Sequence, residues 1–186
     1  MKTINPIAAW HDEHVYFNQL LQLVRRELDV FHRGGRPNYE LMYDIVSYLR
    51  EYGDQAHHPR EDVAFERLAK RCPDIELALA RLEQEHRVIA KAGEALQRQI
   101  EAILDGAIVP RAEVEMAAAT FLVYYRNHIA EEEKDVLTRA AMHLTEADWD
   151  AVKNAAPLLR DPLFGTQAQE RYRELRRQIA LEAAAS

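Results

Sequence analysis

The chain contains two sets of residues whose side chains bind transition metals, and the second set repeats the spacing of the first. Each set has two histidines and one glutamate, and the members are His14, His57 and Glu61, then His86, His128 and Glu132. The offset between the sets is identical for the second histidines and for the glutamates, and it is one position longer for the first histidines. Imidazole nitrogens and carboxylate oxygens suit iron, manganese and zinc. The repeat therefore predicts one pseudo-symmetric site with four histidines and two carboxylates.

In each set the second histidine and the glutamate are four residues apart. On an α-helix this spacing puts two side chains on one face, with Cβ atoms about 6 Å apart, so both can bind the same metal centre. A single pair of this kind is commonly a surface contact within a helix. Here both pairs are expected on interior faces, where a carboxylate that is neither paired nor metal-bound costs several kcal/mol. Their repetition therefore favours a metal site.

The six residues provide most of the ligands that two metal ions need. Four imidazoles, two bridging carboxylates and a bridging oxo or hydroxo group would fill about ten of the twelve positions of two octahedral ions. About two positions remain open. On a redox-active pair held about 3.5 to 4 Å apart, open positions would bind dioxygen, nitric oxide or peroxide.

The repeat also separates these histidines from two others. At the offset that relates His57 to His128, the counterpart of His58 is Ile129, so His57 is preferred over His58 as the ligand. His11 lies one turn before His14 on the same face of the helix. We interpret His11 as a partly exposed group or one that hydrogen-bonds a ligand, and direct metal binding by it stays an open alternative.

Three further residues lie beside the predicted ligands. Glu13 and Glu85 each directly precede a ligand histidine, but on a helix they point about 100° away and are expected to face solvent or a neighbouring helix. Tyr125 lies one turn before His128. Its hydroxyl could hydrogen-bond a bound oxygen species, or the side chain could pack in the core with the hydroxyl satisfied elsewhere.

Long helices must position these residues at one level. Apolar residues recur at three- and four-residue spacing, which predicts four helices over about residues 5–34, 38–71, 73–104 and 110–142. Counted from the breaks between helices at about 1.5 Å per residue, the expected ligands of all four helices lie at nearly the same level. The sequence thus predicts an all-α fold: an up-down-up-down four-helix bundle over residues 1–142, followed by a C-terminal helical extension over residues 143–186.

Composition limits the class of protein and its partners. The 186 residues carry a formal net charge of -7 without a clustered basic face, so neither nucleic acid nor a membrane is an expected partner. No segment approaches the roughly 20 consecutive apolar residues of a membrane span. Cys72 is the only cysteine, and the start of the chain lacks the apolar stretch of a signal peptide, which indicates a cytoplasmic protein. The last amphipathic helix could contribute to a homodimer.

These residues resemble the hemerythrin HHE cation-binding family, whose pattern is a His followed by a His-x3-Glu pair. The pattern occurs twice, as His14 with the segment His57 to Glu61 and as His86 with the segment His128 to Glu132, over about residues 6–142. The resemblance implies a non-haem di-iron centre with carboxylate bridges, in a four-helix bundle that reversibly binds or senses oxygen or a related small molecule. The cofactor it implies is two oxo- or hydroxo-bridged iron ions, for which zinc or manganese could substitute.

The chain departs from the oxygen-carrying members of that family, which use five histidines and place two of them four residues apart on one helix. Here the position four residues after His86 is Ala90. The chain looks more like the branch with four histidines and two glutamates, which includes di-iron proteins of iron-sulfur cluster repair. It lacks the cysteine-bearing N-terminal region typical of those repair proteins.

The leading functional hypothesis is a di-iron protein that binds or senses dioxygen, nitric oxide or peroxide, or that stores iron, and it is favoured over an enzyme. A ferritin-like oxidase is one alternative, because Glu83 and His86 have the Glu-x2-His spacing of that group. The second such motif is missing, since Tyr125 occupies the equivalent position before His128. Another alternative is a structural or regulatory module that metal stabilises and whose extension contacts a partner.

Overall fold

The computed structural model describes residues 6–156, 161–164 and 170–185, and these residues form helices and no strand. The predicted all-α class is confirmed. The elements are α1 (Pro6–His32), α2 (Tyr39–Tyr48), η1 (Leu49–His57), α3 (His58–Arg71), η2 (Pro73–Ile75), α4 (Glu76–Leu104), α5 (Arg111–Glu131), η3 (Glu132–Val136), α6 (Leu137–His143), α7 (Glu146–Lys153), η4 (Glu170–Tyr172) and α8 (Arg173–Ala185). Of these, η1 and η3 are π-helices, and η2 and η4 are short 3₁₀-helices.

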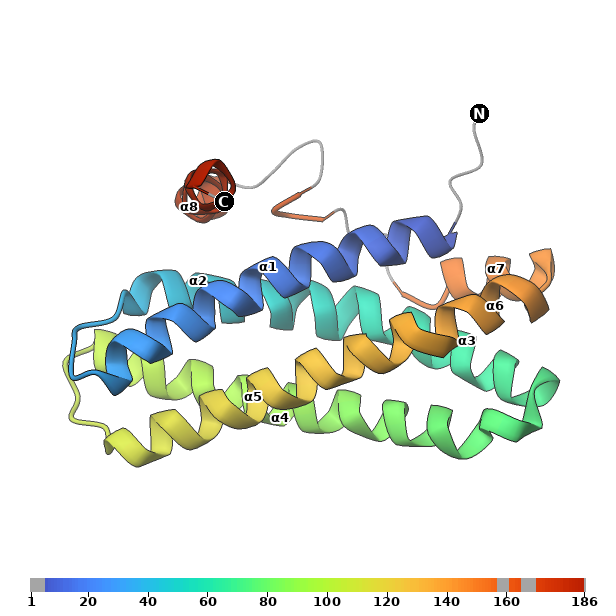
Figure 1. Ribbon diagram of the computed structural model, residues 1–186, viewed down its shortest axis with the longest axis horizontal. Helices are drawn as coiled ribbons and strands as arrows, with labels where there is room; N and C mark the ends of the chain where they lie inside the picture. Colours follow the sequence, from blue (N-terminus) through green and yellow to red (C-terminus); the bar gives the residue numbers. More distant parts are fainter. Residues whose placement is uncertain (1–5, 157–160, 165–169, 186) are drawn as a thin grey trace.

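Long helical rods lie side by side in an elongated bundle (Figure 1). The rods are α1, then α2 continued through η1 into α3, then α4, and finally α5 continued through η3 into α6. The turns after α1 and α4 contain Gly34 and Gly106, with φ of 76° and 85°, a conformation that glycine adopts without steric cost. Both turns lie where the sequence predicts the ends of the first and third helices.

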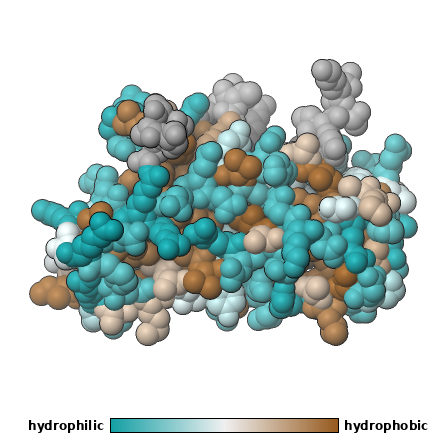
Figure 2. Space-filling view, viewed as in Figure 1, coloured by the Kyte–Doolittle hydropathy of each residue, from teal (hydrophilic) through white to brown (hydrophobic). Residues whose placement is uncertain are grey.

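The core has two apolar clusters with a layer of buried polar residues between them. Along α1, Trp10 belongs to the smaller cluster and Phe17 to the larger one, and the buried His14 lies between them. Along α4, Leu82 and Ile89 occupy the same two clusters on either side of His86. The two clusters therefore enclose the polar layer with apolar packing along the bundle axis. The face of the molecule in Figure 2 is mainly hydrophilic with scattered hydrophobic residues.

Two π-helical segments interrupt the rods, and the sequence analysis did not anticipate them. The nine-residue η1 ends at His57, and the five-residue η3 begins at Glu132, so each touches a residue of the polar layer. Gly53 lies within η1, where an added Cβ would lie 2.6 Å from the hydroxyl oxygen of Tyr125. Such π-helical turns occur frequently at functional sites.

The described C-terminal residues pack against the rods of the same chain. Trp149 of α7 contacts Trp10 edge to face, with ring centroids 5.6 Å apart. Phe164 stacks on Tyr16 at 4.0 Å, and Tyr172 is buried in the larger apolar cluster. No described helix has both the length and the apolar character required to cross a membrane. The division into domains at residues 142 and 143 stays a prediction.

Candidate metal centre

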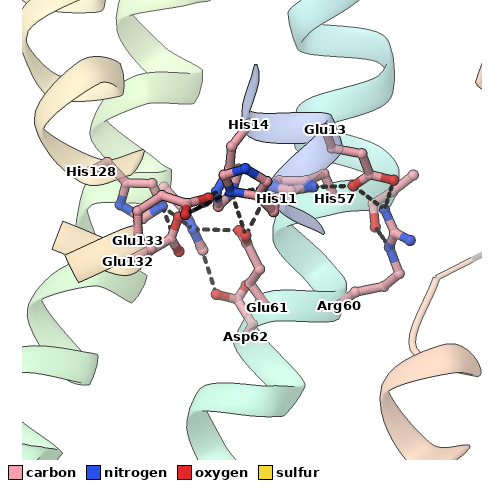
Figure 3. A network of polar contacts seen from close by, with 12 residues as sticks. His11, Glu13, His14, His57, Arg60, Glu61, Asp62, His128, Glu132 and Glu133 are labelled. Carbon is pink, nitrogen blue, oxygen red and sulfur yellow. Dashed lines mark hydrogen bonds and ion pairs between the residues drawn. The ribbon is translucent and has the colours of Figure 1, made fainter. Parts of the chain in front are cut away.

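The six residues predicted from the sequence come together in the buried polar layer. His14 comes from α1, His57 and Glu61 from η1 and α3, His86 from α4, and His128 and Glu132 from the junction of α5 with η3. None is more than 6% exposed. Figure 3 shows the labelled histidine and glutamate side chains converging from neighbouring helices. The helices thus bring residues from distant parts of the chain into one cluster.

The four predicted ligand histidines form two pairs. The Nε2 atoms of His14 and His57 are 3.2 Å apart, and those of His86 and His128 are 2.9 Å apart. Two nitrogens bound to adjacent positions of one octahedral ion by bonds of about 2.1 Å lie about 3.0 Å apart. Each pair therefore has the spacing of two ligands on one ion.

Each glutamate faces both histidine pairs. One oxygen of Glu61 lies 2.8 Å from Nε2 of His57, and its other oxygen lies 3.4 Å from Nε2 of His86. One oxygen of Glu132 lies 3.1 Å from Nε2 of His128, and its other oxygen lies 3.4 Å from Nε2 of His14. Each glutamate therefore directs one oxygen toward each histidine pair.

A second set of carboxylates holds the outer nitrogen of each ring. The four contacts to Nδ1 are Glu133 to His14 at 2.7 Å, Glu13 to His57 at 2.5 Å, Asp62 to His86 at 2.7 Å and Glu85 to His128 at 3.3 Å. An ionised carboxylate only accepts hydrogen bonds, so each Nδ1–H donates outward. In the neutral ring the lone pair of Nε2 then faces the centre, which is the tautomer that binds a metal.

These outer carboxylates obey the same repeat as the ligands. Glu13 and Glu85 are separated by the offset of the first histidines, and Asp62 and Glu133 by the offset of the two ligand glutamates. Asp62 and Glu133 are not among the residues that the sequence marks for a role, whereas Glu13 and Glu85 are predicted to face solvent or a neighbouring helix. In the structure Glu13 and Glu85 face a neighbouring helix, since Glu13 contacts His57 and Glu85 contacts His128. An acidic residue directly beside a first histidine or a ligand glutamate, repeated at the offset of that ligand, is the signal that could have identified all four.

The donor atoms fit a bound cation. When Nδ1 donates outward in two neutral rings, the two Nε2 atoms of a pair face each other with lone pairs at about 3 Å, so a proton or a metal cation between them is required to satisfy both. In addition, Oε2 of Glu61 and both carboxylate oxygens of Glu132 are buried without a hydrogen-bond partner among the described residues. Buried polar atoms are nearly always satisfied. A cation between the pairs would satisfy both the nitrogens and the carboxylates.

The charges around the imidazoles explain how the centre is compensated without a metal. Burial opposes protonation of His14, yet the contacts with Glu133, Glu61 and Glu132 outweigh it and raise the pKa of His14 to about 10. Burial likewise opposes the charge on His86 and His128, whose neighbouring carboxylates raise the pKa values to about 10 and about 9. Protons therefore occupy the metal-free cluster, and a metal ion must displace them.

The residues left open by the sequence have distinct positions. The side chain of His11 is 58% exposed, and its Nδ1 donates to the outer side of Glu133 at 2.9 Å, so it reaches His14 only through that carboxylate. Tyr125 is buried, and its hydroxyl has no hydrogen-bond partner among the described residues. His58, which the sequence analysis set aside, is buried within the cluster together with Glu61, His86 and His128.

The fold and the cluster define a helical metal-binding protein, and the comparison with protein families names the class. The model of the hemerythrin HHE cation binding domain matches residues 5–140. The chain therefore belongs to the hemerythrin HHE cation-binding family, as its paired His and His-x3-Glu units indicate. No curated protein and no solved structure was found to match the chain.

Proposed function

We propose that this protein holds two iron ions in the buried layer and binds a small molecule at the positions that its side chains leave open. The observation that carries the proposal is the placement of Glu61 and Glu132, each with one oxygen toward each histidine pair. A single-ion site would not require two carboxylates that both face two pairs. The ligand class is dioxygen, nitric oxide or peroxide, with iron storage as the related role.

The chain's own residues would hold and tune the ions. His14 and His57 would bind one ion, His86 and His128 the other, and Glu61 with Glu132 would join them. Iron supplies, when bound, the redox chemistry and the open positions. The outer carboxylates fix the imidazole tautomer, and the apolar clusters on both sides of the layer exclude bulk water.

A surface groove gives the site a side that faces solvent. A cavity of about 470 Å³ between α1 and α6 is lined by His11 and Glu133 among other residues. Glu133 contacts Nδ1 of His14 on its inner side. The groove therefore lies on the outer side of His14, with the Glu133 side chain between the groove and the imidazole ring.

The ferritin-like oxidase is less well supported than the binding protein. It requires Glu83 as a ligand, but the Glu83 side chain is 50% exposed and accepts a hydrogen bond from Arg87 at 3.0 Å. A metal-stabilised structural module with zinc or manganese uses the same donor set. Several features stay predictions from the sequence. They are a cytoplasmic location, an up-down-up-down bundle, a homodimer, and the absence of nucleic-acid and membrane partners.

Metal analysis with matched variants tests the proposal. The protein purified without added metal should contain about two irons per chain, with visible absorption that disappears on reduction. Glu61→Gln should lose iron, whereas Glu83→Gln, the same change at an exposed position one helix away, should retain it. Two zinc ions and no colour after growth in iron-rich medium would contradict the redox proposal and favour the structural module. Iron loss from the Glu83 variant would instead favour the oxidase.

A further inference from the structure

His58 lies in the cluster although the sequence repeat favours His57 over it as the ligand. It is 3% exposed and is the first residue of α3. One ligand atom each from His58, Glu61, His86 and His128 lie within 4.8 Å of one another. The ring of His58 stacks on that of His86, with centroids 4.2 Å apart and planes 14° apart. His58 therefore belongs with the second histidine pair.

The two nitrogens of His58 are oriented like those of the four predicted ligands. Its Nδ1 lies 3.3 Å from a carboxylate oxygen of Asp54, one turn earlier on the same rod. Its Nε2 is buried and has no hydrogen-bond partner among the described residues. An unpaired nitrogen of a fully buried side chain requires a specific explanation. The outer carboxylate and the free inner nitrogen together match the other metal-facing histidines.

The π-helix explains how two consecutive histidines both reach the cluster. On an α-helix, neighbouring side chains diverge by about 100°, so only one of them would normally face the centre. Here η1 ends at His57, and the N–H of His58 donates to the carbonyl of Gly53 five residues earlier. The wider turn leaves His57 on the side of His14 and His58 on the side of His86. Each histidine therefore serves a different pair.

The second half of the chain has no equivalent of this group. At the offset that separates the two ligand glutamates, the counterparts of Asp54 and His58 are Tyr125 and Ile129, and neither offers an imidazole. The pseudo-symmetry of the ligands is thus broken at this one place. An additional nitrogen is available to the His86 side of the cluster, and the His14 side has none.

We infer that His58 is a fifth imidazole ligand, which binds through Nε2 to the metal ion held by His86 and His128, and that Asp54 is the positioning residue that orients its ring. The inference rests on the proposed two-metal centre. It makes the two metal positions unequal, since one has three imidazoles and the other has two. The two ions should therefore bind with different affinities and different spectra.

Titration of the metal-free 186-residue chain with Co²⁺ tests the inference. The wild-type protein should bind two ions in two steps with distinct visible spectra. His58→Phe keeps a ring against His86 but removes the nitrogen, and it should weaken one step by about tenfold or more and change the bands of that ion alone. His32→Phe, the same substitution at an exposed histidine near the end of α1, should leave both steps unchanged.

The alternative is that His58 is only a packing residue. In that case His58→Phe binds both ions as tightly as the wild type with unchanged spectra, and the inference is overturned. If His58→Phe does not fold, His58→Gln replaces it in the same titration. The wild-type titration then also tests the inference, because two equivalent binding steps would contradict two unequal metal positions. Asp54→Asn should weaken the same step by about tenfold and alter its spectrum. A wild-type protein that binds fewer than two ions would instead overturn the proposed two-metal centre.

Discussion

The two halves of the bundle, α1 with α2–α3 and α4 with α5–α6, each supply three of the six ligands predicted from the sequence but differ in how they support them. Each half provides two histidines, a glutamate that faces both pairs, and two outer carboxylates. They differ in their π-helices, since η1 precedes the His-x3-Glu unit of the first half whereas η3 follows that of the second. The halves therefore agree in the three predicted ligands that each supplies, and they differ in His58, which only the first half has, and in the backbone behind the ligands.

The support of the outer carboxylates also differs between the halves. Glu13 accepts hydrogen bonds from Tyr52 and Arg60 as well as from His57, and although burial opposes its charge, these contacts lower its pKa to about 2. Glu85 has a long contact with His128 at 3.3 Å and an ion pair with Arg81 on its own helix. Glu13 therefore holds His57 by a shorter contact, and with more supporting hydrogen bonds, than Glu85 holds His128.

The largest expected loss of metal affinity concerns the ligand glutamate that each half supplies. Glu61→Gln and Glu132→Gln each remove a carboxylate that faces both histidine pairs, so both should reduce metal affinity by more than about 100-fold, beyond the usual effect of outer partners. Calorimetric titration of the metal-free variants with Fe²⁺ under anaerobic conditions measures this loss. A large loss in only one variant would show that one carboxylate binds a single ion and does not bridge.

The next effect concerns pH and involves both halves. The pKa values of His14 and His86 are raised from 6.5 to about 10 in the folded metal-free protein. Protonation of these groups stabilises the fold below the unfolded pKa of about 6.5, and this contribution is lost as pH rises through about 10. The free energy of unfolding of the metal-free protein should therefore fall across this range, whereas metal affinity should rise because protons no longer compete.

Urea unfolding with and without metal, at several pH values across this range, checks the sign of both changes. Without metal, the midpoint should move to lower urea concentration as pH increases. The stabilisation that metal adds should grow over the same range. A metal-free midpoint that is constant or increases with pH would show that the imidazoles are neutral in the folded state.

A third effect separates the outer carboxylates of the two halves. Glu13→Gln should weaken metal binding by about 10- to 100-fold, since it disturbs His57 and leaves Arg60 without its carboxylate partner. Glu85→Gln should have a smaller effect, because the contact it removes is longer and more exposed. Metal titrations of the two variants under one condition give the ratio. Equal losses would show that the additional contacts of Glu13 do not strengthen its hold on His57.

The smallest expected effect concerns the π-helix of the first half. In Gly53→Ala the new Cβ would lie 2.6 Å from the Tyr125 hydroxyl, and overpacking of this kind costs about 1 to 3 kcal/mol, partly offset by the better helix propensity of alanine, about 1 kcal/mol. Adding Tyr125→Phe removes the clashing oxygen and should restore part of the stability. Urea unfolding of the single and double variants measures the coupling. Independent, additive effects would exclude the clash as the cause.

Sequence and structure agree best where a rule is local. Helix ends at Gly34 and Gly106 follow from the conformational freedom of glycine, and the positions of His57 and Glu61 on one face follow from four-residue helical spacing. Such features depend on a few neighbouring residues, so they can be predicted before the fold is known. The two π-helices could not be predicted in this way, because an inserted residue leaves the hydrophobic periodicity on either side nearly intact.

The choice of the six predicted ligands follows from residue order alone, because ligand type and the repeated offset are both visible there. Which carboxylate holds which histidine depends on the packed fold, since Glu13 contacts His57 and Glu133 contacts His14 across helices. The fold also places His58 inside, although the repeat does not mark it as a ligand. The physical reason is that a helical face is set by local geometry, whereas a contact between helices depends on how whole rods pack and on where a π-turn rotates one of them.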